Sequence, residues 1–236
     1  MGKIRAILRQ RGFRLFKRPY ELNIVGIRSV SVRSNSFDDE IHVFYKTAGI
    51  NWHYHIYKVT TDPGTFWLRN PMQPQGTAIL AQGQYVDAYQ IGLHRGQYIA
   101  LVQRKPVTIM RDYDRDATLD FLNGRKDTGL FGINIHRALS KGTTKYIEKF
   151  SAGCQVFENA GDFAEFILLC ERHRKLYGNK FTYTLIDFRA VQREGRKRFA
   201  ISTALGLSVI GYFFEELKNI ITNQFKNQNH EDTTRV

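Results

Sequence analysis

Cys154 and His136 are the residues in this 236-residue chain whose types and spacing best suit nucleophilic catalysis. His136 follows a short apolar strand predicted over residues 131–135, and the sequence SAGC (151–154) begins fifteen residues later. A thiol is mostly protonated near neutral pH, so it needs a base or a cation to become a good nucleophile. His136 is the nearest histidine that could take the thiol proton and return it to a leaving amine.

Gly153 lets the backbone bend tightly beside the cysteine, so that the amides of Gly153 and Cys154 could point at a developing oxyanion. This interpretation predicts a lowered thiol pKa at Cys154. It predicts no such shift at Cys170, which lies on the apolar face of a predicted helix and is assigned to packing. A single Cys and a single His are more often structural, so the residues alone establish only a candidate pair.

The arrangement resembles the catalytic domain of the L,D-transpeptidases of the YkuD type. The family signature is a histidine followed about fifteen to eighteen residues later by Ser/Thr-His-Gly-Cys. His136 matches the histidine, and Ser151, Gly153 and Cys154 match three of the four later positions. Segments 60–66, 132–135 and 162–163 resemble the family's turn, its strand before the histidine and the start of its later helix. The resemblance covers roughly residues 40–185.

This resemblance implies a role for each matching residue. Cys154 would be the nucleophile, His136 the base, Gly153 part of the oxyanion hole and Ser151 a substrate-binding residue. The backbone carbonyl of Arg137 would orient the imidazole. The family's second histidine is replaced by Ala152 here, which affects the region that shapes the oxyanion and the substrate.

The implied substrates are peptidoglycan stem peptides. The enzyme would form an acyl-thioester with a stem peptide and pass it to an amine, as a transpeptidase, or to water, as a carboxypeptidase or endopeptidase. Both outcomes share the thioester, and neither needs a cofactor. The alternative is an inactive domain of the same fold, serving as a structural or binding component of an envelope assembly or a virus particle.

The fold class predicted is mostly β, in the α+β class, and the resemblance implies a β-sandwich with a helix after the cysteine. Strand patterns run from residue 20 to 107, a helix is predicted over 162–177 with Asp162 as N-cap and Gly178 after its end, and 181–188 is a closing strand. We divide the chain into a basic arm (1–18), a catalytic domain (19–188), a basic linker with a hydrophobic helix (189–222) and a polar tail (223–236).

The positive charge is concentrated outside the predicted catalytic domain. The formal net charge is +13, of which residues 1–18 carry +7 and residues 189–198 carry +4. Such arms suit an anionic membrane or an anionic wall polymer, and nucleic acid is a weaker third candidate. The composition excludes a disordered chain and a polytopic membrane protein, and two cysteines exclude a disulfide-rich mini-domain.

Localisation at the cell envelope or a membrane is expected, although no ordinary signal peptide precedes Pro19. Ile4, Ile7 and Leu8 lie at helical spacing among arginines, which suits either a basic interfacial helix or a frayed tail. The uncharged run 199–214 is a candidate for a short membrane span or a buried helix. Without a signal peptide, the protein could reach the wall through lysis or inside a virus particle.

One acidic stretch is a candidate for calcium binding. The acidic side chains occupy positions 1, 3, 5 and 9 of a possible loop, and they belong to Asp112, Asp114, Asp116 and Asp120. Ala117 replaces the loop glycine and Asn123 the final glutamate, so an EF-hand is rejected. A looser Ca²⁺ turn and a solvated acidic turn both remain open.

Overall fold

The computed structural model describes residues 1–121 and 124–197. The chain divides into two compact units, Met1–Val191 and Gln192–Val236, and the elements from α1 to β11 belong to the first. In chain order they are α1 (Gly2–Gln10), β1 (Asn23–Arg28), β2 (Asp39–Lys46), β3 (Trp52–Thr60), α2 (Thr65–Arg69), β4 (Thr77–Leu80), β5 (Gly83–His94), β6 (Tyr98–Gln103), β7 (Val107–Asp112), β8 (Arg125–Gly129), β9 (Ile135–Arg137), β10 (Gln155–Phe157), α3 (Ala160–Tyr177) and β11 (Phe181–Asp187). A further helix begins at residue 188 and is described as far as residue 197.

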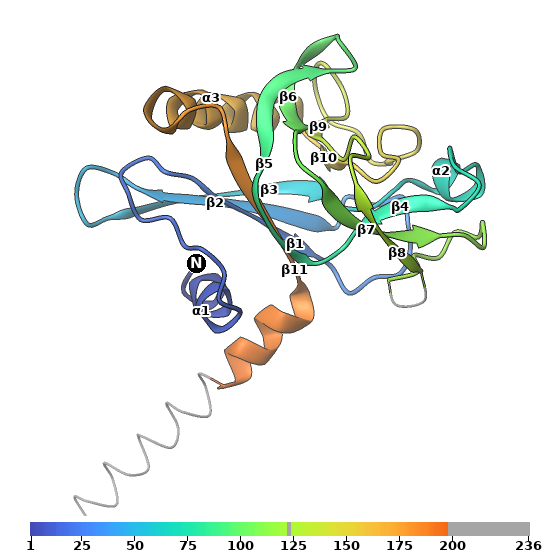
Figure 1. The fold of residues 1–236 in the computed structure, drawn as a ribbon, viewed down its shortest axis with the longest axis horizontal. Coiled ribbons are helices and arrows are strands. Elements are labelled where there is room, and N and C mark those ends of the chain that lie inside the picture. The colour runs from blue at the N-terminus through green and yellow to red at the C-terminus, as the bar shows by residue number, and fades with distance from the viewer. Residues whose placement is uncertain (122–123, 198–236) are drawn as a thin grey trace, which may run out of the picture. The chain divides into compact units, whose positions relative to one another are not determined.

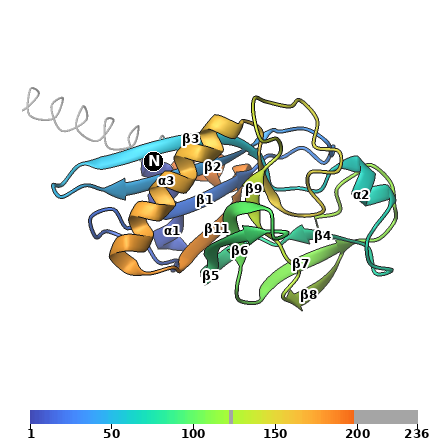
Figure 2. The same cartoon turned by 90° about the horizontal axis from the view of Figure 1, so that it is seen from above.

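The predicted mostly-β, α+β class is confirmed. In detail, eight strands form a closed barrel in the order β1-β11-β5-β6-β9-β10-β3-β2, where the resemblance implied a β-sandwich. The barrel closes because β1 pairs with β2 on one side and with β11 on the other. A separate sheet, β4-β7-β8, lies beside α2 (Figures 1 and 2).

The barrel interior is filled by alternate, apolar side chains of its strands, as the period-two pattern predicts. The side chains of Ile135 and Phe157 belong to this core, and neither is exposed. Neighbouring positions on β9 and β10 therefore point away from the core. The candidate catalytic residues lie on this outer side of the barrel wall.

Helix α3 follows the predicted helix closely and covers one side of the barrel (Figure 2). Its N-cap is Asn159, whose side chain accepts from two backbone N–H groups, rather than the predicted Asp162. Gly178 ends the helix with a φ of +83°, in the region that favours glycine. Phe163, Phe166 and Cys170 face the barrel core, so the packing role predicted for Cys170 is confirmed.

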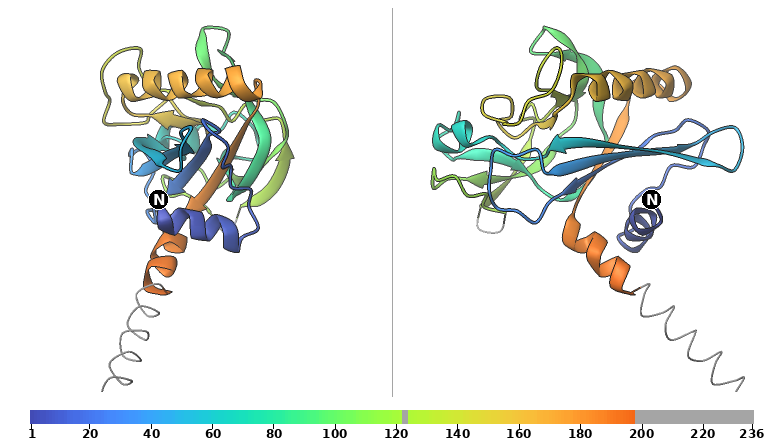
Figure 3. Two further views of the ribbon diagram at one scale, coloured as in Figure 1. Left: turned by 90° about the vertical axis from the view of Figure 1, so that its left-hand side faces the viewer. Right: turned by 180° about the vertical axis from the view of Figure 1, so that it is seen from behind.

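Helix α1 packs against the barrel (Figure 3), and its apolar side is covered. Ile4, Ile7 and Leu8 are at most 3% exposed, and they lie in a cluster with Val25 and Phe44. Residues at the start of the chain therefore contribute to a core. Neither a frayed tail nor an apolar face free to enter a membrane is found here.

Two predicted features fall wholly or largely outside the described residues. They are the hydrophobic run 199–214 with the rest of its helix to 222, and the polar tail 223–236. None of the helices in the described part of the chain combines the length and the apolar character that a membrane crossing requires.

Candidate active site

Cys154 and His136 are brought together by the parallel pairing of β9 with β10. The register pairs Ile135 with Gln155 and His136 with Val156. Cys154 lies directly before β10, two residues from the partner of His136. Because alternate residues of a strand share a face, both residues belong to the outer face of this strand pair.

The imidazole of His136 is held in one tautomer. Its Nδ1 lies 2.8 Å from the carbonyl oxygen of Arg137, which can only accept, so Nδ1 carries the proton. The hydroxyl of Tyr98 lies 3.2 Å from the same nitrogen and donates to the Arg137 carbonyl at 3.2 Å. The carbonyl contact that the resemblance implied for Arg137 is therefore present, and Nε2 is left as the basic nitrogen.

His94 is a second histidine of the site that the sequence analysis did not identify. Its ring stacks on that of His136, with the centroids 4.0 Å apart, and its Nδ1 accepts from Asn134 Nδ2 at 3.0 Å. Burial, and then the proximity of His94 and Arg95, lowers the pKa of His136 to about 3. The His136 imidazole is therefore neutral near pH 7. The turn at Gly96 could have indicated this position of His94. It places His94 opposite Tyr98, whose hydroxyl contacts the His136 ring.

The Cys154 thiol is half-buried and forms two hydrogen bonds with a neighbouring segment. Its Sγ donates to the Gly132 carbonyl at 3.4 Å and accepts from the Asn134 N–H at 3.4 Å. Burial raises the pKa of Cys154 to about 11, although the Asn134 N–H and Arg95 favour the thiolate. The predicted lowered pKa is wrong, because loss of solvation outweighs both favourable contacts.

The turn before Cys154 is organised by Ser151. This side chain is fully buried; its hydroxyl donates to the Cys154 carbonyl at 2.8 Å and accepts from the Gly153 N–H at 3.1 Å. Ser151 therefore holds the turn, and the substrate-binding role that the resemblance implies for it stays a prediction. The Gly153 N–H, to which the resemblance assigns a part of the oxyanion hole, donates to Ser151 here. In the described part of the chain, the Cys154 N–H has no acceptor.

Gly153 is required for the shape of this turn. Its φ is +118°, and a Cβ at this position would lie 2.3 Å from the Ala78 carbonyl oxygen. Its own carbonyl accepts from Gln155 Nε2 at 3.3 Å, and Gln155 Oε1 accepts from the Tyr183 hydroxyl at 2.9 Å. Tyr183 has room only because a glycine, Gly26, faces it. The turn is thus supported from inside the barrel.

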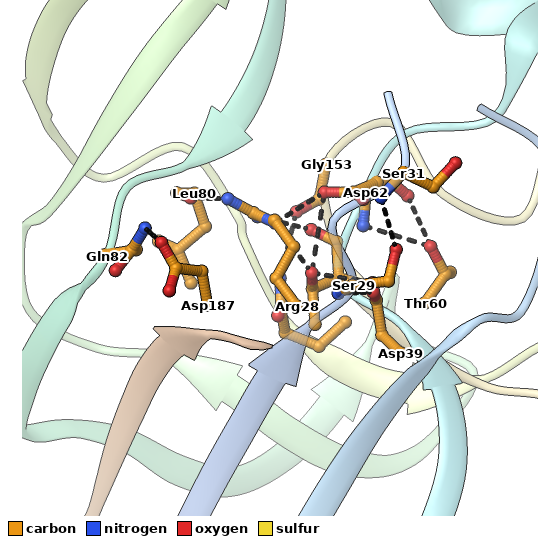
Figure 4. A network of polar contacts seen from close by, with 12 residues as sticks. Arg28, Ser29, Ser31, Asp39, Thr60, Asp62, Leu80, Gln82, Gly153 and Asp187 are labelled. Atoms are coloured by element: carbon orange, nitrogen blue, oxygen red, sulfur yellow. Dashed lines mark hydrogen bonds and ion pairs between the residues drawn. The ribbon is translucent and has the colours of Figure 1, made fainter. Parts of the chain in front are cut away.

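A buried ion pair supports the turn from a second direction (Figure 4). Arg28 Nε lies 2.8 Å from Asp62 Oδ1, and Arg28 Nη1 donates to the Leu80 carbonyl at 2.9 Å. The loop that carries Asp62 continues to Gly64, whose N–H donates to the Ser151 carbonyl at 2.9 Å. The same segment, 60–66, leads into helix α2. In the family that the sequence resembles, the corresponding turn leads into a strand.

The acidic side chains of 112–120 form turns with the backbone. Asp112 Oδ2 accepts from the Asp120 N–H at 3.1 Å, and Asp114 Oδ1 accepts from the Asp116 N–H at 3.2 Å. Within 1–121 and 124–197, no three His, Cys, Asp or Glu side chains are grouped to hold a metal ion. Asn123 of the possible loop lies outside the described residues.

The assembled site contains a thiol, a neutral imidazole of fixed tautomer and a backbone N–H without an acceptor. Such groups can carry out acyl transfer through a thioester. The hydrogen bonds of the described residues include none between the thiol and His136, so a proton transfer between them requires a rearrangement of the side chains. Comparison of the chain with protein-family models, curated proteins and solved structures finds no match.

Proposed function

We propose that this protein is a cysteine acyltransferase that acts on peptidoglycan stem peptides. The observation that carries the proposal is the tautomer of His136, which the Arg137 carbonyl fixes, together with the cysteine that directly precedes the neighbouring strand β10. A base with its lone pair on Nε2 is what a neutral thiol requires for activation. The residue pattern that resembles the L,D-transpeptidases supplies the substrate class.

The neutral resting state defines the order of proton movements. Cys154 Sγ attacks the peptide carbonyl carbon while its proton moves to His136 Nε2. The tetrahedral intermediate collapses when this proton reaches the leaving amine, and the acyl-thioester remains. An acceptor amine, or water, then attacks the thioester and gives its proton to His136, and the departing sulfur regains it. The Cys154 N–H is the available donor for the oxyanion.

The proposed setting is the cell envelope or a membrane surface. The exposed basic side chains of segment 1–18 support attachment to an anionic lipid or wall polymer, since the apolar side of α1 is already covered. Nucleic acid is the less favoured partner. We propose no cofactor, because the thiol and the imidazole suffice for the chemistry. The proposed route of the protein to the cell wall is through lysis or inside a virus particle.

The test is intact-mass spectrometry of the full chain after incubation with a carbapenem, an acylating mimic of the donor. A covalent adduct is expected on the wild type and on Cys170→Ala, and none on Cys154→Ala. Incubation with a stem tetrapeptide, with and without an acceptor amine, then separates transfer from hydrolysis. Absence of an adduct together with absence of peptide turnover would contradict the proposal.

A second candidate function is an inactive domain that binds or supports an envelope or particle assembly. It is favoured by the engagement of the Gly153 N–H with Ser151 and by the raised pKa of the Cys154 thiol. On this alternative, binding of stem peptides or of intact peptidoglycan is retained in Cys154→Ala and no turnover occurs in the wild type. The same two assays therefore discriminate between the candidates.

A further inference from the structure

A pocket of about 240 Å³ lies beside the candidate site. It is formed by α2 and the segment that follows it, by the β4-β7-β8 sheet and its continuation, and by the turn before Cys154. Its lining includes Trp67, Ala78, Arg111, Leu130, Phe131 and Ala152. The volume is below the about 300–1,000 Å³ of drug-sized sites, so it suits a single terminal residue rather than a long segment.

The pocket is connected to the thiol through two stretches of chain. Ala152, at its wall, precedes Cys154 by two residues. Phe131, also at its wall, precedes Gly132, whose carbonyl accepts the thiol hydrogen bond. Ala152 stands where the resembling family has a histidine, and its small side chain helps to keep the space open. The pocket therefore borders the two segments that flank the thiol, the turn 151–153 and the stretch that begins at Phe131.

Arg111 supplies the positive charge of the pocket wall, and its hydrogen bonding is incomplete. The residue is only 9% exposed, and its Nε–H has no acceptor among the described residues. Nη1 donates to the Gly76 carbonyl at 3.3 Å, and Nη2 lies 3.1 Å from Asp127 Oδ2. The Asp127 side chain is 47% exposed, so solvent weakens its compensation of the buried charge.

These features select a carboxylate as the ligand group. A guanidinium matches the two oxygens of a planar carboxylate, and a buried N–H without an acceptor is costly. The Phe131 ring lies 5.1 Å from the guanidinium carbon, and Trp67 and Leu130 extend the apolar wall. Apolar walls around one cation favour an amino-acid residue over a free inorganic anion.

We propose that the Arg111 pocket binds the terminal carboxylate of the acyl-donor peptide, which makes the substrate a peptide acid. This inference rests on the proposed acyltransferase function. The leaving amine of a donor cleaved at its last peptide bond belongs to the residue that bears this carboxylate. Binding in the pocket would thus place the preceding carbonyl toward Cys154.

The test uses calorimetric titration of the full-length Cys154→Ala variant, which cannot react, with a stem tetrapeptide and with its C-terminal amide. The acid is expected to bind at least about tenfold more tightly than the amide. Arg111→Met in the same background is expected to abolish this preference. Arg104→Met, which removes an exposed arginine outside the pocket, is the matched control and should retain it.

Ala152→Leu provides an independent variant that narrows the pocket while leaving Arg111 in place, and it should weaken binding of the acid. Equal binding of acid and amide would overturn the inference, as would a preference that survives in folded Arg111→Met. Displacement of the peptide by inorganic phosphate as effectively as by acetate would overturn the carboxylate assignment. If a carbapenem adduct forms but the acid binds no more tightly than the amide, only the role of the Arg111 pocket is refuted. If the acid binds more tightly but neither an adduct nor turnover is seen, only the acyltransferase function is refuted.

Discussion

The ring of His94 stacks on the ring of His136 at a centroid distance of 4.0 Å, with 25° between the planes. His94 ends β5, and His136 lies in β9, so the barrel itself brings the two rings together. Asn134 connects His94 to Cys154, because its side chain donates to His94 and its backbone N–H donates to the thiol. The stack therefore couples the geometry of the base to that of the thiol.

Replacement of His94 by phenylalanine should raise the pKa of His136. Burial is the main cause of the low value of about 3, and proximity to His94 is the next. His94→Phe retains a stacked ring and removes the second cause, so the pKa rises while remaining well below 6.5. Imidazole NMR titration measures this change. His53→Phe, whose ring stacks on Tyr45, is the control and should leave the His136 titration unchanged.

Thiol labelling should distinguish the two cysteines by its dependence on pH. The pKa of Cys154 is raised to about 11 by burial, so its alkylation is slow at pH 7 and accelerates about tenfold per pH unit. Cys170 is fully buried and should stay unlabelled in the folded protein. Mass spectrometry after timed iodoacetamide treatment at pH 7 to 10 follows both sites. A rate at Cys154 that is independent of pH would argue against this thiol environment.

Loss of the Tyr183 hydroxyl should destabilise the barrel and loosen the turn before Cys154. The hydroxyl is buried and donates to Gln155, so Tyr183→Phe leaves an acceptor without a partner at a cost of about 1–3 kcal/mol. Urea unfolding measures the free energy, and Cys154 labelling reports on the turn. Tyr146→Phe changes a residue that is 62% exposed and should alter neither quantity.

The buried Asp62 should make stability depend on pH. Burial raises the pKa of Asp62 from 3.8 to about 7, despite the ion pair with Arg28. Between these values the folded protein retains a proton that the unfolded chain releases, so rising pH disfavours folding. This contribution is complete below about pH 3.8 and is lost as the pH passes 7.

The comparison of wild type with Asp62→Asn isolates that effect from the other titrating groups. The melting temperature of the wild type, relative to the variant, should fall by about 3 °C or more between pH 4 and pH 8. Glu148→Gln removes an exposed carboxyl and serves as the control, with no such change. A difference between wild type and Asp62→Asn that is constant with pH would contradict the raised pKa.

Truncation of a side chain in α1 should cost as much as truncation in an ordinary core. Leu8 is 1% exposed, so Leu8→Ala should lower the free energy of unfolding by about 2–5 kcal/mol. Leu168 on α3 is 70% exposed, and Leu168→Ala should cost about 0.5 kcal/mol or less. Denaturant unfolding of both variants measures the difference. Equal, small effects would indicate that α1 is not anchored.

Local patterns were sufficient for the fold class and for much of its secondary structure. The apolar face of Phe163, Phe166 and Cys170 predicted α3, and alternation predicted strands such as β3 and β5. The closure of the barrel was not predictable in this way. It depends on the pairing of β1 with β11, which lie far apart in the chain, and no local residue pattern records such a pairing.

The candidate site was likewise predictable from local patterns only in part. The spacing of His136 and the 151–154 sequence indicated the pair, and the Arg137 carbonyl lies where the resemblance placed it. The stacking of His94, the burial of the thiol and the engagement of Ser151 within its own turn arise from tertiary packing. Burial decides the pKa of Cys154, which is why reasoning from residue types predicted the wrong direction.

The pairing of β1 with β11 also bears on how the protein is made. Residues 23–28 emerge from the ribosome well before their parallel partner, residues 181–187, which is synthesised more than 150 residues later. Until then one edge of β1 is unpaired, and such edges promote association between nascent chains. We expect slow, late barrel closure, because high contact order delays folding, and a nascent chain stalled before β11 should depend on chaperones.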